Sequence, residues 1–132
     1  MKRKSNALEN LDKAFSELQI FSKTEKPSKL ERAGIIQAFE FTFELIWKVF
    51  KVVAEEEGLS APSPKSAFKQ AYKMGIIQDE AVWIKLLDSR NLTTHTYNEE
   101  LAESIYRDIV NRYVPEFARA IQAIKTRQKS LG

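Results

Sequence analysis

Apolar side chains recur every three to four residues along almost the whole chain, and few segments alternate with a period of two. That spacing is typical of amphipathic α-helices, whose apolar stripe faces a core. The strongest stripe runs between Ile36 and Val53, where further apolar residues widen it around most of the helix girth. Such a helix normally lies at the centre of a bundle. The chain is therefore predicted to be an all-α protein with this segment as its central helix.

Capping and helix-breaking residues divide the chain into helices of predictable extent. We expect a first helix from about residue 6 to 23, a second from the end of the polar loop 24–28 to Glu57, and a short third from Pro64 to about Met74. Gly58 follows the second helix directly, as glycine commonly does at a helix end.

The C-terminal half should contain two further helices. Asp79 can cap a fourth helix, and Asn98 or Thr96 can cap the last one. Pro115 removes a backbone donor inside that last helix, so a kink is expected there. The basic tail is expected to be solvated and frayed at Lys125, Arg127 and Lys129. Four long helices and one short helix predict an antiparallel up-and-down bundle, with residues 1–132 as a single domain.

The composition excludes several kinds of site. Without cysteine the chain has neither disulfides nor thiolate metal sites, and one histidine with scattered carboxylates does not make a metal-ligand set. No glycine-rich loop is present to hold phosphate, so we expect no cofactor and no independent binding of nucleoside triphosphates.

The same survey limits the location and the partners. Charged residues interrupt the most apolar stretch, residues 35–54, and the N-terminus lacks a signal-peptide pattern. We therefore expect a cytoplasmic chain without membrane association. The net charge of +3 suits a protein partner as well as a nucleic acid. RNA stays a possible partner, and nothing points to DNA.

Residues 90–97, Arg-Asn-Leu-Thr-Thr-His-Thr-Tyr, contain the only histidine of the chain. An imidazole exchanges protons near neutral pH, and a guanidinium matches the geometry of a phosphate. With the phenol of Tyr97 close by, Arg90 and His95 would suit phosphate-ester chemistry if their side chains faced one place.

Helix geometry sets a condition on that arrangement. On an unbroken α-helix Arg90 and His95 would point roughly 140° apart, because each residue turns the helix by about 100°. Threonine is a poor helix former, and three threonines lie between residues 93 and 96. The sequence therefore predicts a helix end near Thr93–His95, at a subunit interface where two chains share a cleft.

Charged side chains inside the central apolar helix form a second candidate group. Glu44 and Lys48 have the i,i+4 spacing of an ion pair, and Glu40 extends the acidic row toward the N-terminus. A carboxylate of this row could orient the histidine. The alternative is an ordinary salt bridge on an exposed helix edge, worth roughly 0.3–0.5 kcal/mol.

Plainer roles are available for several of these residues. A single histidine at a helix end is more often a cap or a surface group than a catalyst. Trp47 and Trp83 are expected in the core or at a dimer contact, where large aromatic side chains predominate. The remaining tyrosines fit helix stripes and need no function.

The pattern Arg-x4-His-x-Tyr at Arg90, His95 and Tyr97, with Asn91 after the arginine, resembles the HEPN superfamily. Within it the chain is similar to the HepT-like group, also known as nucleotidyltransferase substrate-binding proteins. Residues 37–48, Gln-Ala-Phe-Glu-Phe-Thr-Phe-Glu-Leu-Ile-Trp-Lys, look like the second helix of that group. The resemblance spans nearly the whole chain, from the first helix through Pro115.

The resemblance implies a helical homodimer that works with a small nucleotidyltransferase. One implied role is a metal-independent ribonuclease toxin, silenced when the partner transfers AMP to Tyr97. His95 would then be the general acid or base, Arg90 would stabilise the phosphorane, and Asn91 would orient the phosphate or the imidazole. The other implied role is a non-catalytic subunit that binds the substrate of the nucleotidyltransferase.

Overall fold

The computed structural model describes the backbone of residues 2–131 and the side chains of residues 4–128. The helices it contains are α1 (Lys2–Ser22), α2 (Lys29–Glu56), α3 (Pro64–Lys73), α4 (Glu80–Leu92), α5 (Glu99–Asp108) and α6 (Val114–Leu131). A 3-10 turn at Thr93–His95 follows α4, and a π-helical turn at Ile109–Tyr113 joins α5 to α6. No strand is present in these residues, and the predicted all-α class is confirmed.

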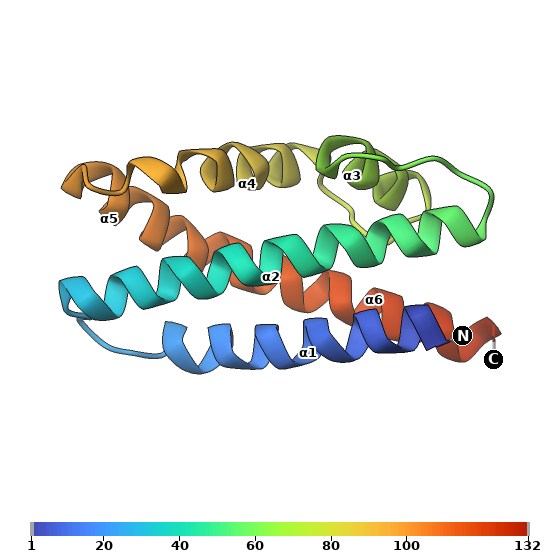
Figure 1. The fold of residues 1–132 in the computed structure, drawn as a ribbon, viewed down its shortest axis with the longest axis horizontal. Helices are drawn as coiled ribbons and strands as arrows, with labels where there is room; N and C mark the ends of the chain where they lie inside the picture. Colours follow the sequence, from blue (N-terminus) through green and yellow to red (C-terminus); the bar gives the residue numbers. More distant parts are fainter. Residues whose placement is uncertain (1, 132) are drawn as a thin grey trace.

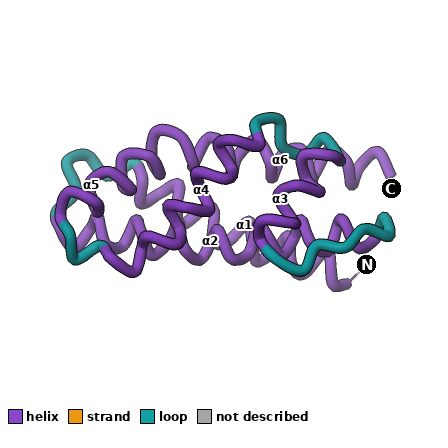
Figure 2. Tube along the Cα trace, turned by 90° about the horizontal axis from the view of Figure 1, so that it is seen from above, coloured by secondary structure: helices purple, strands orange, loops and turns teal. Residues whose placement is uncertain are grey.

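The helices form an antiparallel up-and-down bundle (Figure 1). α1 and α2 pack side by side as a helical hairpin, and α4 runs back along α2 in the opposite direction. The α5–α6 run then returns, so that both chain ends lie at the same end of the bundle. Seen from above, α3 and α4 cover one side of α2 (Figure 2). Within residues 2–131, no helix combines the length and the apolar composition that crossing a membrane requires.

Local signals explain where the helices begin and end. Ser28 caps α2 in a reciprocal capping box with Glu31, and Ser63 caps α3 with Pro64 as its first residue. Asp79 caps α4 and Asn98 caps α5, each accepting a hydrogen bond from a backbone N–H three residues on. Asp79 and Asn98 are caps that the sequence predicted, with Asn98 rather than Thr96 at the last helix. The first helix begins at Lys2, four residues before the predicted start.

Aromatic rings fill the centre of the bundle. Phe39 on α2 stacks on Tyr113 and Phe117, with ring centroids 5.6 and 5.9 Å away. Trp83 on α4 is fully buried and contacts Phe68 and Phe117 at 5.1 and 5.8 Å. Pairs at these separations add to the stability that area burial provides. The core position expected for Trp83 is confirmed, whereas Trp47 is only half-buried.

The last helix deviates from regularity where Pro115 predicted a kink. The N–H of Val114 bonds to the carbonyl of Ile109, five residues earlier, in the π-helical turn. A proline ring clashes with the carbonyl four residues before it, and widening the preceding turn moves that carbonyl away. The two α-helical parts therefore continue as one run across the irregular turn.

The basic tail was predicted to be frayed, but the structure shows it as part of a helix. α6 continues to Leu131, Lys125 pairs with Asp12 on α1 at 2.9 Å, and Arg127 pairs with Glu57 at the end of α2. The sequence pattern could not reveal these partners because they lie far away in the chain. The side chain of Lys129 lies outside the described residues.

The phenol of Tyr113 should make the stability of the fold depend on alkaline pH. The side chain is fully buried, and burial raises the pKa of Tyr113, although a hydrogen bond with Ser89 at 2.7 Å acts in the opposite direction. The folded state therefore holds the phenolic proton more tightly than the unfolded chain, whose tyrosines titrate near about 10. This contribution is complete below that value and is lost as the pH rises through the higher folded pKa.

Urea unfolding of wild type and Tyr113→Phe at pH 7, 9 and 11 tests this expectation. At pH 7 the variant should lose about 1 kcal/mol, because Ser89 loses its partner. Between pH 9 and 11 the wild type should lose more stability than the variant. Parallel losses in the two proteins would show that other groups cause the alkaline destabilisation.

Candidate functional site

The α4 helix ends where the threonine-rich segment begins, as predicted. α4 ends at Leu92, and Thr93–His95 form a single 3-10 turn. The hydroxyl of Thr93 lies 2.7 Å from the carbonyl oxygen of Arg90, and that of Thr96 donates to the carbonyl of Thr93 at 3.2 Å. Such side-chain bonds to nearby carbonyls favour a turn over a continued helix.

Arg90 faces the acidic row of α2. Its Nη1 lies 3.2 Å from Oε2 of Glu40, and its Nε lies 4.0 Å from Oε1 of Glu44. The hydroxyl of Thr93 accepts from Arg90 Nη1 at 3.1 Å and lies 2.8 Å from the same Glu40 oxygen. This triangle ties the end of α4 to the middle of α2. The acidic row therefore holds the arginine rather than the histidine.

The predicted ion pair between Glu44 and Lys48 is absent. Glu44 instead accepts a hydrogen bond from the indole N–H of Trp47 at 3.2 Å, and its other oxygen faces Arg90. Lys48 is exposed and forms no ion pair with any residue that the structure describes. The carboxylate lies on the half-buried side of α2, where the arginine and the indole offer shorter contacts than a flexible lysine in solvent.

His95 and Tyr97 form a second, separate pair at the surface. The Nδ1 of His95 lies 3.2 Å from the phenolic oxygen of Tyr97, and the rings meet edge to face at 5.8 Å. Both side chains are exposed, Tyr97 by 78%. Asn91 is exposed without a hydrogen bond to another described residue. Within the described part of the chain, no hydrogen bond joins Arg90 to His95.

An ion cluster fastens the start of α5 just after this pair. Arg32 on α2 contacts Glu99 at 2.7 Å and Glu103 at 3.5 Å, while Lys29 contacts Glu99 at 3.0 Å. Hydrogen bonding by Arg32, then by Lys29, holds the pKa of Glu99 below its usual value. The same contact with Glu99 raises the pKa of Arg32. The cluster fixes the C-terminal end of the segment that carries His95 and Tyr97, and the contacts of Arg90 and Thr93 with Glu40 fix its N-terminal end.

Sequence reasoning missed this cluster. Glu99 and its partner Arg32 are 67 residues apart in the chain. A local pattern gives no signal for a contact of that separation. Among the described side chains, no three histidine, aspartate or glutamate residues gather as they would around a metal ion.

The chain matches a protein-family model described as nucleotidyltransferase substrate binding protein like, over residues 6–126. It belongs to this family. The match includes the whole candidate site, from the acidic row of α2 to Tyr97, and the HepT-like resemblance is thereby confirmed.

Members and structural neighbours of the family carry two kinds of description. A Haemophilus influenzae relative named probable ribonuclease HepT is 35% identical over 82 residues, which are 58% of this chain and 56% of the relative. The match thus spans little more than half of that relative's length. A solved Haemophilus influenzae structure, described as the substrate binding domain of a nucleotidyltransferase, is 27% identical with a TM-score of 0.68. It covers 94% of this chain and 98% of its own.

A second solved structure is similar in fold alone. It is a tri-AMPylated HEPN toxin of Shewanella oneidensis in complex with its MNT antitoxin, 16% identical with a TM-score of 0.74. The alignment covers 93% of this chain and 96% of that one. The nucleotidyltransferase substrate binding protein-like fold thus occurs in proteins described as ribonuclease or toxin and in one described as a substrate binding domain.

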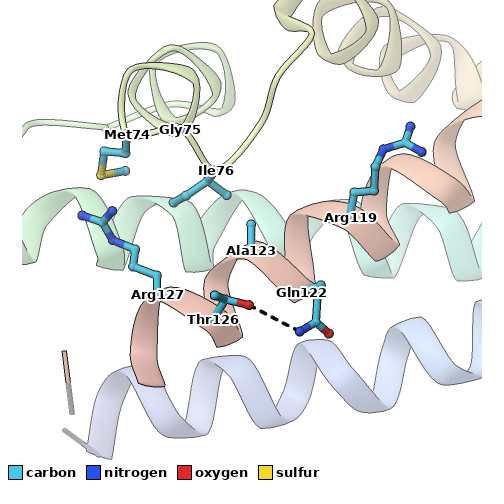
Figure 3. Close-up of a pocket in the computed structure, with 8 residues that line it drawn as sticks. All are labelled: Met74, Gly75, Ile76, Arg119, Gln122, Ala123, Thr126 and Arg127. Atoms are coloured by element: carbon cyan, nitrogen blue, oxygen red, sulfur yellow. Dashed lines mark hydrogen bonds between the residues drawn. The ribbon is translucent and has the colours of Figure 1, made fainter. Parts of the chain in front are cut away.

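The bundle of this chain also has a groove, which lies apart from the Arg90–Tyr97 segment. It lies toward the end of the bundle where the chain termini lie (Figure 3). Its volume is about 610 Å³, and α6 lines it opposite Met74 and Ile76. Arg119 pairs with Glu116, and Arg127 pairs with Glu57, so both arginines of the groove have acidic partners. We assign this groove no role in the candidate site.

Proposed function

We propose that this chain is one component of a cytoplasmic two-protein nucleotidyltransferase system and acts in it as a HepT-like ribonuclease that needs no metal ion. We further propose that its partner silences it by transferring AMP to Tyr97. The observation that carries the proposal is the pair of exposed side chains, His95 and Tyr97, with Nδ1 and the phenolic oxygen 3.2 Å apart. Family membership and the name of the Haemophilus influenzae relative support it.

In the proposed cleavage the imidazole of His95 takes the proton of a ribose 2′-hydroxyl. The 2′-oxygen then attacks the adjacent phosphorus, a 2′,3′-cyclic phosphate forms, and the 5′-oxygen of the next nucleotide leaves with a proton from an acid. Histidine suits both proton transfers because it titrates near neutral pH. Asn91 next to Arg90 is exposed and would orient the phosphate or the imidazole.

Arg90 would stabilise the negative charge of the phosphorane. Its side chain is 26% exposed, and Glu40 holds it at the edge of the turn. Because no hydrogen bond joins Arg90 to His95 within one chain, we propose a homodimer in which two such ends complete a cleft. The exposure of Leu92 and Phe41, by 42% and 59%, supports a covering partner at this end of α4 and on α2.

Silencing would follow from the contact between the two surface rings. The phenolic oxygen of Tyr97 would form a bond to the α-phosphorus of ATP on the partner, the bond to the β-phosphate would break, and pyrophosphate would leave. The phenolic proton would pass to a base of the partner. An adenylyl group on that oxygen would stand beside the imidazole and exclude RNA by bulk and by negative charge.

Mass spectrometry of the chain after incubation with the partner nucleotidyltransferase and ATP tests the modification. The expected result is a mass gain of one AMP that maps to Tyr97 and is absent in Tyr97→Phe. The modified chain should also lose RNA cleavage. If the partner binds the chain but the mass at Tyr97 does not increase, the proposed silencing is wrong.

A non-catalytic substrate-binding subunit is the second candidate function. The description of the family and that of the solved Haemophilus influenzae structure favour it. It predicts tight binding to the nucleotidyltransferase, chain-dependent transfer to a small molecule, and no cleavage of RNA. Transfer assays with and without this chain separate the two candidates.

A further inference from the structure

The α3 helix carries a row of lysines on its exposed side. Lys65, Lys69 and Lys73 are four residues apart, which places them along one face at intervals of about 6 Å. All three are exposed, and α3 contains no acidic residue. Tyr72 lies beside the row and is 48% exposed. Sequence patterning assigned no role to this tyrosine or to these lysines.

The lysines of the row lack ion-pair partners, although many cations of this chain have one. Lys4, Lys85 and Lys125 each lie within 4 Å of a carboxylate, at 3.1, 3.6 and 2.9 Å. In contrast, none of the three lysines of α3 forms an ion pair or a hydrogen bond with a described residue. Their charges are therefore available to an external anion.

The opposite face of α3 fixes the row rigidly to the bundle. Phe68 is fully buried and meets Phe50 at 6.0 Å and Trp83 at 5.1 Å, measured between ring centroids. Trp83 precedes Arg90 on α4 by seven residues, a rise of about 10 Å. A ligand that extends from the candidate site along α4 by a few times this rise would reach the lysine row.

We propose that this face of α3 binds single-stranded RNA and holds the part of the substrate strand that extends from the cleavage site along α4. A row of cations that tracks a backbone, with an aromatic ring for base stacking, is the usual surface for single strands. The exposed ring of Tyr72 adds a stacking surface for a base to the positive charges. The inference rests on the proposed ribonuclease function, because it names where that substrate is held.

The test measures RNA binding without cleavage. Fluorescence anisotropy of a labelled single-stranded RNA of about 12 nucleotides is recorded with the full chain carrying His95→Ala, at several salt concentrations. Replacing Lys65, Lys69 and Lys73 with glutamine should weaken binding about tenfold or more at low salt and reduce the salt slope by about 2. Tyr72→Ala should weaken binding by roughly fivefold or more, and Tyr72→Phe should restore it, because the ring still stacks.

The matched control is a second triple variant with glutamine at Lys13, Lys23 and Lys26, three exposed lysines outside α3. Its net charge falls by the same three units, so equal weakening in both triple variants would overturn the proposal. Unchanged binding in the α3 variant, or no RNA binding by the parent chain, would overturn it too. Circular dichroism should show that both triple variants keep their helix content, because the altered side chains are exposed.

The outcomes also separate the RNA-binding surface from the ribonuclease function. If RNA binding depends on α3 but the wild-type chain, which retains His95, does not cleave RNA, the result supports the surface and contradicts the ribonuclease. Cleavage that depends on His95, with full binding and activity in the α3 variant, contradicts the surface alone. If the α3 variant instead loses its nucleotidyltransferase partner while RNA binding is unchanged, the face binds protein and the proposal is wrong.

Discussion

Replacing His95 with alanine should lower RNA cleavage by the purified chain by about 10²- to 10⁴-fold, the usual contribution of a general acid or base. The side chain is exposed, and among the described side chains its one hydrogen-bond partner is Tyr97, so the replacement should leave the fold intact. Cleavage is followed as the appearance of fragments ending in a 2′,3′-cyclic phosphate. The assay contains a chelator, because the proposed reaction uses no metal ion.

Thr94→Ala is the matched control for this experiment. Thr94 lies in the same 3-10 turn, is exposed, and forms no hydrogen bond with a described residue. Its replacement should change the rate less than twofold. Equal activity of wild type and His95→Ala would contradict catalysis by His95, and a folded wild type without activity would favour the substrate-binding alternative.

Replacing Phe39 with alanine should destabilise the bundle by about 3–5 kcal/mol. Phe39 is fully buried and stacks on Tyr113 and Phe117, so the loss of its ring leaves a cavity between α2 and the last helical run. A single domain has a total stability of about 5–15 kcal/mol, so the variant should lose a large part of it. Urea unfolding followed by circular dichroism measures the difference.

Phe41→Ala on the same helix is the control, because Phe41 is 59% exposed. Its cost should be at most about 0.5 kcal/mol in a single chain. If two chains cover Phe41, as the proposed homodimer implies, that cost should grow with protein concentration, whereas the cost of Phe39→Ala persists in dilute solution. Similar losses in the two variants at low concentration would contradict the packing of α2 described above.

Helix signals that act over three or four residues were readable from the sequence. The apolar stripe of α2 predicted its central place, and Pro64 and Asp79 predicted the starts of α3 and α4. The threonine-rich segment predicted the break at Thr93–His95. In each case the determining contacts lie within one or two helical turns.

Contacts between distant segments were not readable in the same way. Glu44 has Lys48 at a suitable spacing, yet its carboxylate faces Arg90 and Trp47. Lys125 and Arg127 looked like a solvated tail, yet Asp12 and Glu57 hold them. A spacing rule describes only the neighbours on the same helix, and helix packing decides which other side chains compete for the charge.

By itself, the sequence determined the helices and the break after α4, because each depends on residues near one another in the chain, and two separate motifs, residues 37–48 and 90–97, indicated the family. The tertiary structure alone decided the partners of two charged side chains: Glu40 for Arg90 and Glu99 for Arg32. Packing α4 and α5 against α2 brings charges from distant segments within about 4 Å, where their attraction outweighs that of separated pairs in solvent.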